Sequence, residues 1–279
     1  MFRVDAHHHL WDLSVRDEPW IDDALAAIRR TFTVSDLAAV ARPAGVDATV
    51  LVQTVTVADE TPELLAIDDP LIAGVVGWID LTAPDAADRL AELRCDRLVG
   101  IRHQVQGEPD RRWLCRPDVR AGLAAVAREG LVYDLLTIPE QLPAAIDTVR
   151  ALPELRFVVD HLSKPPIATG EVEPWATQMR ALAAHENVAC KLSGMVTEAD
   201  WAAWTVDDLR PYAEVVLDAF GPERVLFGSD WPVCLLAASY AEVIEAAELL
   251  VAGLSAAERE QVLGGTARRI YGLRAGTLP

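Results

Sequence analysis

Short runs of β-branched and other apolar residues recur along the chain, and most are separated by stretches in which apolar residues return every three or four positions. The runs have the length of buried strands, whereas the periodic stretches are typical of amphipathic helices. The pattern predicts eight strands, at residues 2–7, 48–53, 72–80, 98–103, 131–136, 155–161, 187–193 and 224–230. It predicts helices at residues 35–42, 85–94, 118–128, 139–152, 175–185 and 207–220.

Strands that alternate with helices form a parallel sheet whose two faces are covered. Eight such units in about 250 residues match a single closed (β/α)8 barrel. The rival architecture is an open, doubly wound sheet. Eight strands are many for such a sheet, and no glycine-rich phosphate loop follows the first strand. We therefore expect a distorted (β/α)8 TIM barrel of the α/β class.

Three local signals extend this fold prediction. Gly130 follows the helix at 118–128, where a C-capping glycine belongs. Ser255 and Glu258 have the spacing of a capping box and predict a C-terminal helix. The segment 12–32 is long for a connection and carries Trp20, so we expect it to fold over one mouth of the barrel.

Composition and charge exclude several classes of protein. The 279 residues include 43 acidic and 25 basic ones, which gives a net charge of −18. Such a surface repels phosphate backbones and anionic lipids, so we expect no nucleic acid and no membrane as partner. No apolar run approaches the ~20 residues of a membrane span. No linker or repeat divides the chain, so we expect residues 1–279 to form one domain, and a homo-oligomer is left open.

The four cysteines are far apart in the sequence, at Cys95, Cys115, Cys190 and Cys234. Their spacing fits neither a zinc ribbon nor a disulfide framework, and it favours a reducing compartment. The first residues turn polar quickly and contain no apolar targeting segment. We therefore expect a cytoplasmic protein.

Histidines gather where the predicted strands end. His7 and His9 leave the first strand, His103 ends the fourth and His161 ends the sixth. Side chains alternate along a strand, so His7 and His9 share one face and are suited to hold a metal or to polarise a substrate. The alternative is a polar turn with one histidine as its cap. Because active sites of these barrels lie at the carboxyl ends of the strands, we favour the functional interpretation.

Asp230 ends the last predicted strand. The first and last strands are neighbours in a closed barrel, so Asp230 is expected beside His7 and His9. A carboxylate there can bind a divalent metal, take a proton from water, or do both. The alternative is a helix N-cap, a common task of aspartate, but a cap gives the histidine pair no partner.

Six short motifs stand in order at the predicted strand ends and near the end of the chain. They read Asp-Ala-His-x-His-x-Trp, Gly-Ile-Arg-His, Asp-His-x-x-Lys-Pro, Lys-Leu-Ser-Gly, Gly-Ser-Asp-Trp-Pro and Gly-Gly-Thr-Ala-Arg-Arg-Ile-Tyr. Together they resemble the amidohydrolase superfamily. Within it, the chain is similar to the amidohydrolase-related (amidohydrolase 2) branch that includes L-fuconolactonase and other sugar-acid lactonases. The resemblance spans residue 4 to about residue 273.

The resemblance implies roles for individual residues. Asp230 is expected as the general base, with His9 and His161 as further catalytic residues. The expected metal ligands are His7, His9, His161 and Asp230. Binuclear members carry a bridging, carboxylated lysine on an early strand, but the third and fourth predicted strands here contain neither lysine nor glutamate. We therefore expect one divalent metal, Zn²⁺, or no required metal.

Other polar and aromatic residues near the strand ends are candidates for substrate binding. Arginine pairs with oxygens in a bidentate manner, and indoles offer flat apolar faces with one donor, which suits a sugar ring. For Lys191 the alternative is a buried ion pair with Asp134 or Asp160, and for each tryptophan it is core packing. The expected substrate-binding residues are Arg102, His103, Gln53, Trp78, Lys191 and Trp231.

The resemblance implies a hydrolase that opens a small lactone in carbohydrate metabolism. A sugar-acid lactone such as L-fuconolactone or L-rhamnonolactone is the expected substrate. Water is activated by Asp230, and the ester carbonyl is polarised by the metal or by His9, His161 and Arg102. Two alternatives stay open, namely a metal-dependent decarboxylase of the same superfamily and a non-catalytic barrel that binds a sugar.

Overall fold

A computed structural model, which describes residues 1–273, contains a parallel sheet of eight strands in the order β1 to β8. This confirms the predicted (β/α)8 barrel. Three strands end two or three residues before their predicted bounds: β3 at Gly77, β6 at Val159 and β8 at Phe227. The strands are β1 (Val4–His8), β2 (Ala48–Val52), β3 (Ile72–Gly77), β4 (Leu98–His103), β5 (Val132–Leu135), β6 (Arg156–Val159), β7 (Val188–Leu192) and β8 (Val225–Phe227).

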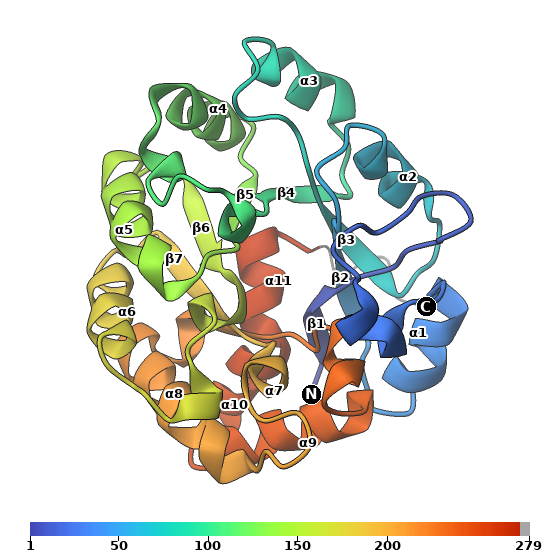
Figure 1. The fold of residues 1–279 in the computed structure, drawn as a ribbon, viewed down its shortest axis with the longest axis vertical. Coiled ribbons are helices and arrows are strands. Elements are labelled where there is room, and N and C mark those ends of the chain that lie inside the picture. The colour runs from blue at the N-terminus through green and yellow to red at the C-terminus, as the bar shows by residue number, and fades with distance from the viewer. Residues whose placement is uncertain (274–279) are drawn as a thin grey trace.

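Helices surround the strands as a ring (Figure 1). Five of them join successive strands at places where the sequence predicts a helix with related bounds: α1 (Val34–Ala41), α3 (Ala86–Leu93), α4 (Pro117–Arg128), α5 (Leu142–Ala151) and α6 (Trp175–Ala183). The predicted helix before β8 is α8 (Val206–Phe220). The hydrophobic pattern missed three: α2 (Glu60–Ala66), α7 (Met195–Glu198) and α9 (Tyr240–Leu250).

The helix ends follow the capping signals of the sequence. Gly130 has φ 71° directly after the capping residue of α4, a left-handed conformation that glycine adopts without steric cost. Ser255 and Glu258 form the predicted capping box at the start of α10 (Ala256–Glu260). A π-helical turn, Gln261–Gly265, then leads into α11 (Thr266–Tyr271).

One apolar core lies between the strands and the surrounding helices. A separate apolar cluster fills the interior of the barrel, and α11 completes it. Small and β-branched side chains from all eight strands fill it, and Ala267, Tyr271 and Leu273 cover it at the end opposite the strand carboxyl ends. The Tyr271 hydroxyl donates to Asp134 Oδ1 at 2.8 Å. α11 lies in the middle of the ring of helices (Figure 1), so the barrel is closed at this end and open for binding at the other.

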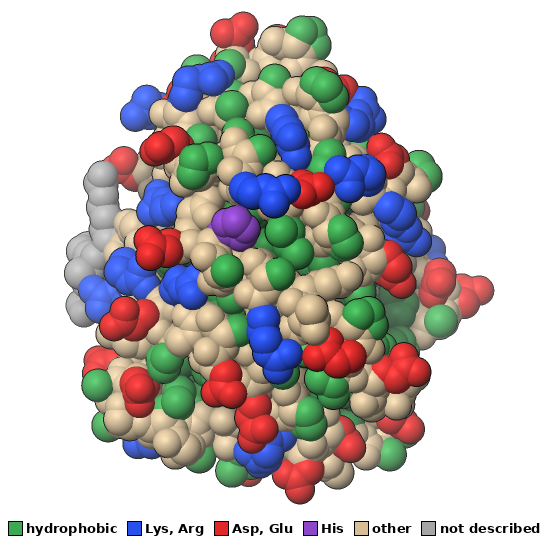
Figure 2. Space-filling view, turned by 90° about the vertical axis from the view of Figure 1, so that its left-hand side faces the viewer, with side chains coloured by type: hydrophobic (Ala, Val, Ile, Leu, Met, Phe, Trp, Pro, Cys, Tyr) green, Lys and Arg blue, Asp and Glu red, His purple; other side chains and the backbone are tan. Residues whose placement is uncertain are grey.

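The surface carries charged side chains of both signs. On the face shown in Figure 2, acidic and basic side chains are interspersed, without a separate basic stripe. Within residues 1–273, no helix combines the length and apolar character that crossing a membrane requires.

The seam between β1 and β8 is joined by backbone hydrogen bonds just beyond the end of β8. The N–H of Asp230 donates to the carbonyl of His7 at 2.8 Å, and the N–H of His9 donates to that of Trp231 at 2.7 Å. The fully buried Asp5 of β1 stabilises this seam through its carboxylate. Its carboxylate accepts from the N–H groups of Ser229 (2.8 Å) and His7 (3.1 Å).

The Asp5 carboxylate also accepts two hydroxyl hydrogen bonds, from Ser229 at 2.6 Å and Tyr240 at 3.0 Å. Burial raises the pKa of Asp5 to about 6, and these hydrogen bonds oppose that rise. At neutral pH the group is therefore an ionised acceptor with four donors, which fixes the positions of β1 and of the loop after β8 relative to each other.

Replacing Asp5 with alanine should lower the free energy of unfolding by about 3 kcal/mol, because buried donors lose their acceptor. Tyr240→Phe, the matched control, removes one of the four hydrogen bonds and should cost about 1 kcal/mol. Urea unfolding of the three proteins measures both effects. Equal stability of Asp5→Ala and Tyr240→Phe would contradict a central role of the carboxylate.

Candidate active site

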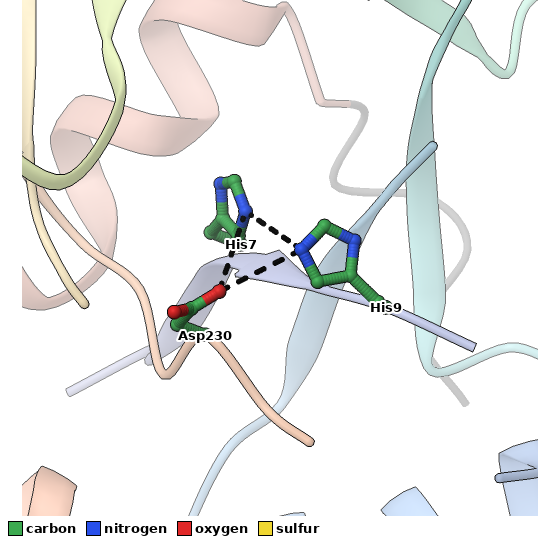
Figure 3. A group of neighbouring side chains, drawn as sticks. All are labelled: His7, His9 and Asp230. Carbon is green, nitrogen blue, oxygen red and sulfur yellow. Dashed lines mark hydrogen bonds and ion pairs between the residues drawn. The ribbon is translucent and has the colours of Figure 1, made fainter. Parts of the chain in front are cut away.

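Three predicted residues meet at the seam, where their side chains point toward one another (Figure 3). His7 lies on β1, His9 follows it, and Asp230 lies in the loop after β8. His7 Nε2 is 3.1 Å from His9 Nε2, and Asp230 Oδ1 is 3.7 Å and 3.6 Å from these two nitrogens. His8 turns to the other face, as the strand alternation predicts, and its Nε2 lies 2.9 Å from the Thr49 hydroxyl.

His161 reaches the same cluster from the loop after β6. Its Nε2 lies 3.8 Å from Asp230 Oδ1, and its Nδ1 lies 2.9 Å from Ser193 Oγ. His161 and the next three residues all have φ between 50° and 57°, and Asp230 has φ 57°. Such left-handed non-glycine residues cost about 1–3 kcal/mol each and concentrate at functional sites. The left-handed turn explains why β6 ends before His161.

The tautomer of His9 follows from its neighbours. His9 Nδ1 lies 2.7 Å from the carbonyl oxygen of Val52, which can only accept, so Nδ1 carries the hydrogen. His9 Nε2 therefore presents a lone pair toward His7 and Asp230. On the other side of His7, Nδ1 lies 3.0 Å from the Lys191 ammonium, which donates to it.

Burial sets the charge of the three imidazoles. It lowers the pKa of His7 well below its ordinary value, with help from the Lys191 charge, and it lowers the pKa of His9. Burial also lowers the pKa of His161 to about 4. Burial alone would raise the pKa of Asp230, but the neighbouring His161 and His9 rings bring it below the usual aspartate range. At neutral pH the cluster consists of neutral imidazoles and one carboxylate.

This donor set fits a zinc ion. The donor atoms of His7, His9 and Asp230 lie within 4.8 Å of one another, and tetrahedral zinc with bonds of about 2.0–2.1 Å places its ligand atoms roughly 3.3 Å apart. Binding through His7 Nε2 requires the other tautomer of this ring, in which Nδ1 carries a hydrogen and no longer accepts from Lys191. Asp160 Oδ1 lies 3.4 Å from that Nδ1 and receives no well-aligned hydrogen bond, so it is placed to accept that hydrogen.

His161 belongs to a second set of possible ligands. Its donor atom lies within the same limit of His7 and Asp160. The carboxylate of Asp160 is already paired, however, with Arg102 Nη1 at 3.0 Å and Lys191 Nζ at 2.9 Å. Two adjacent cations disfavour a metal ion at this second set, because like charges repel strongly where water is excluded.

Lys191 is fully buried beside His7. We predicted a substrate-binding cation, but the structure buries its side chain completely, and it does not line the cavity described below. Its ammonium contacts Asp134 Oδ2 at 2.5 Å in addition to Asp160 and His7. The buried ion pair, the alternative that the sequence left open, describes its position. The reason is that two carboxylates at the barrel centre need a positive charge.

A cavity of about 470 Å³ opens above the cluster at the carboxyl ends of the strands. Four predicted residues line it: His9, Arg102, His161 and Asp230. Trp20 and Leu25 of the segment 12–32 also line it, which confirms that this segment reaches over the barrel mouth.

Four other predicted binding residues lie outside the cavity wall. Gln53 is fully buried and its Nε2 donates to the Arg102 carbonyl at 3.1 Å. Trp231 is 2% exposed and packs against Phe32, with ring centroids 5.2 Å apart. Trp78 and His103 contact each other, since the indole N–H donates to His103 Nδ1 at 3.0 Å. None of the four is among the residues that line the cavity, and direct contact of any of them with substrate stays a prediction.

Sequence reasoning missed several residues of the cavity wall. Thr54 follows β2, and Gln104 and Gln106 follow β4. Lys164 also lines the wall and forms an ion pair with Glu198 at 2.8 Å. Lys164 is part of the Asp-His-x-x-Lys-Pro motif, so its sequence signal was present but unassigned. The others are polar residues in loops, which carry no periodic signal.

Comparison with known proteins identifies the family. A family model described as Amidohydrolase matches residues 4–273. The chain belongs to the amidohydrolase family. This amidohydrolase is 42% identical to an L-fucono-1,5-lactonase of Burkholderia multivorans, over 97% of this chain and 96% of that protein. It is 41% identical to an L-fucono-1,5-lactonase of Burkholderia ambifaria, over 86% of this chain and 84% of that protein.

The amidohydrolase also resembles a solved structure closely. A crystal structure of an amidohydrolase from Burkholderia multivorans with bound Zn superposes with a TM-score of 0.93 at 40% identity. The match covers 98% of this chain and 100% of that one. The family and the fold that the six motifs imply are thus confirmed.

The lowered pKa of His161 predicts a pH dependence of stability. An unfolded histidine titrates near 6.5, whereas the folded ring has a pKa of about 4. The stabilisation is fully present above pH 6.5 and is lost as the pH falls toward 4, a change of about 3 kcal/mol. His161→Asn should reduce this slope, since asparagine tolerates positive φ.

Urea unfolding of both proteins between pH 7 and about 4.5 tests this prediction. Burial raises the pKa values of Asp5 and Glu60, so these two groups make stability rise as the pH falls. Because both proteins contain them, this contribution cancels in the comparison. Parallel stability curves would show that folding leaves the pKa of His161 unchanged, which would contradict the prediction.

Proposed function

We propose that this amidohydrolase hydrolyses a sugar-acid lactone, with Asp230 as the general base. The observation that carries the proposal is an ionised, buried carboxylate at the floor of a 470 Å³ cavity, surrounded by neutral imidazoles. The two relatives named L-fucono-1,5-lactonase support an L-fuconolactone or a similar substrate. They favour ester hydrolysis over the decarboxylase and sugar-binding alternatives.

The proposed reaction begins with a water molecule beside Asp230. Asp230 Oδ1 accepts a proton from this water as its oxygen attacks the lactone carbonyl. The ester C–O bond then breaks, and the leaving ring oxygen takes up a proton, so that the product is a hydroxy acid. The low pKa of Asp230 keeps it deprotonated and ready to accept at neutral pH.

The carbonyl oxygen gains negative charge during the attack, and the cavity floor offers groups to stabilise it. We assign this task to His161 and to the positive charge of Arg102 beside it. His9 presents a lone pair at Nε2, so its proposed part in catalysis is that of a metal ligand. Arg102 donates to Asp160 and to the Gln53 carbonyl, which hold its guanidinium group in one orientation. Gln53, Trp78, His103, Trp231 and Lys191 support the floor and walls from behind.

His7, His9 and Asp230, with His161 next to them, would hold one divalent metal, for which zinc is the proposed ion. When bound, zinc acts as a Lewis acid on the carbonyl or the water. We also propose a cytoplasmic location, which the separated cysteines favour. One domain over residues 1–279 stays a prediction, and so does the absence of nucleic acid and membrane partners.

Asp230→Asn tests the general base. Asparagine keeps the shape and tolerates φ 57°, but it cannot accept the proton. The variant should fold and bind the lactone, while kcat falls by roughly 10²–10⁴ in an assay of ring opening with a pH indicator. Asp218→Asn on the exposed side of α8 is the matched control and should keep full activity. A loss of less than about fivefold would make His161 the base instead.

We expect at most one tightly bound zinc per chain. The positive charges of Arg102 and Lys191 beside Asp160 oppose a second ion. Elemental analysis after loading with excess zinc and desalting measures the stoichiometry. His9→Ala should release the ion, because losing one of three or four ligands leaves too few bonds. Two equivalents per chain in the native protein would contradict the prediction.

A further inference from the structure

A pair of buried carboxyl groups lies beside the cavity, outside the site described above. Glu18 comes from the segment 12–32 and is 3% exposed, and Glu60 begins α2 and is 2% exposed. Both contact the same hydroxyl. Thr54 Oγ1 lies 2.9 Å from Glu18 Oε1 and 2.7 Å from Glu60 Oε1. We refer to Glu18 and Glu60 as the carboxyl pair.

Counting hydrogens shows that the carboxyl pair needs one proton. Glu60 accepts from the backbone N–H groups of Thr54 at 2.6 Å and Val55 at 3.2 Å, which occupies both its oxygens. Thr54 has a single hydroxyl hydrogen to donate. If it donates to Glu60, then Glu18 must supply a hydrogen to Thr54 Oγ1. The arrangement is a chain from a protonated Glu18 through Thr54 to an ionised Glu60.

The surroundings favour retention of that proton. Burial raises the pKa of Glu60 to about 7 and also raises the pKa of Glu18. The nearby charged groups are Arg16 and Asp17 on the same segment and Glu63 on α2. Arg16 is paired with Glu63 at 2.9 Å. Because the two carboxyl groups share one hydroxyl, the last proton belongs to the pair rather than to one residue.

The carboxyl pair is connected to the cavity through Trp20. The indole N–H of Trp20 donates to Glu18 Oε2 at 2.7 Å, and both Trp20 and Thr54 line the cavity. Trp20 also packs edge-to-face on Trp11, with centroids 5.5 Å apart. The ends of the segment are joined by backbone hydrogen bonds between Trp11 and Phe32. Between those ends, the buried Glu18 joins the segment to the barrel through its contact with Thr54.

We propose that Trp20 is a substrate-binding wall of the cavity, and that Glu18 is a positioning residue that holds it there through one proton shared with Glu60. The role of Trp20 rests on the proposed function. An indole face suits the apolar face of a sugar-derived ring. When the proton is lost, two adjacent carboxylates repel each other, and Glu18 moves because it lies on a loop whereas Glu60 is held by two backbone N–H groups.

The proposal predicts an asymmetry between two conservative variants. In Glu18→Gln the amide oxygen accepts from Trp20 and the amide NH₂ donates to Thr54, which imitates the protonated acid permanently. Glu60→Gln has only one oxygen for two backbone N–H donors, so it disturbs the contact at every pH. Trp20→Phe removes the indole N–H and part of the wall.

Kinetics between pH 6 and about 8 test the proposal. The KM of the native enzyme should rise roughly fivefold over this range while kcat changes little, as expected for a binding contact. Glu18→Gln should keep the low KM throughout, and Glu60→Gln and Trp20→Phe should show a raised KM at all pH values. Glu92→Gln, an exposed control on α3, should follow the native enzyme. Identical KM profiles for the native enzyme and Glu18→Gln would overturn the proposal.

Hydrogen–deuterium exchange provides a readout without substrate. Residues 14–28 should exchange equally in the native protein and Glu18→Gln at pH 6, and faster in the native protein at about pH 8. Comparing the two proteins at the same pH cancels the intrinsic pH dependence of exchange. If the two proteins exchange equally at both pH values, the shared proton is overturned. If their exchange differs at about pH 8 but the enzyme opens no lactone, only the proposed function is overturned.

Discussion

The hydrogen bonds of Asp5 are the constraint on which the rest of the site depends. A parallel barrel closes only where its first and last strands meet, and here the last strand is three residues long. Asp5 compensates for that short strand by accepting from β1 and from the loop after β8 simultaneously. The same contacts bring His7 and Asp230 together from positions more than 220 residues apart in the sequence. Closing the barrel and assembling the site are therefore one event.

The charges beneath the site form a compensated group rather than a set of independent ligands. Lys191 pairs with both Asp134 and Asp160, and Arg102 pairs with Asp160, so two negative and two positive side chains balance in a space that excludes water. Removing one member leaves an unpaired buried charge, which is far more costly than the net value of the intact group. Asp230 stands apart from this group and faces the cavity among the neutral rings of His7, His9 and His161. This separation of tasks suits a base that must accept and release a proton.

The sequence predicted features that depend on local pattern or on position along a strand. Eight strands, the His7–His9 pair and the neighbouring Asp230 follow from periodicity and barrel closure alone. The positions of Lys191, His103 and Trp231 did not follow, because each depends on which partner a loop or a distant strand supplies. Lys191 at a strand end looks equally suited to substrate or to two aspartates. The left-handed turn at His161 has no clear sequence signature. Histidine is enriched at positive φ, but Leu162, Ser163 and Lys164 are not.

The contact between Tyr271 and Asp134 has a consequence for how the protein is made. During synthesis all eight strands precede α11, and the end of the barrel that α11 covers stays bare until residue 271 has emerged. Contacts of such long sequence separation form late and slowly. Until α11 has been made, apolar side chains of the strands stay uncovered, and such surface is prone to aggregation. A truncation that removes α11 acts far from the cavity, yet it leaves the buried carboxylate of Asp134 without its hydroxyl partner and the barrel without its cover.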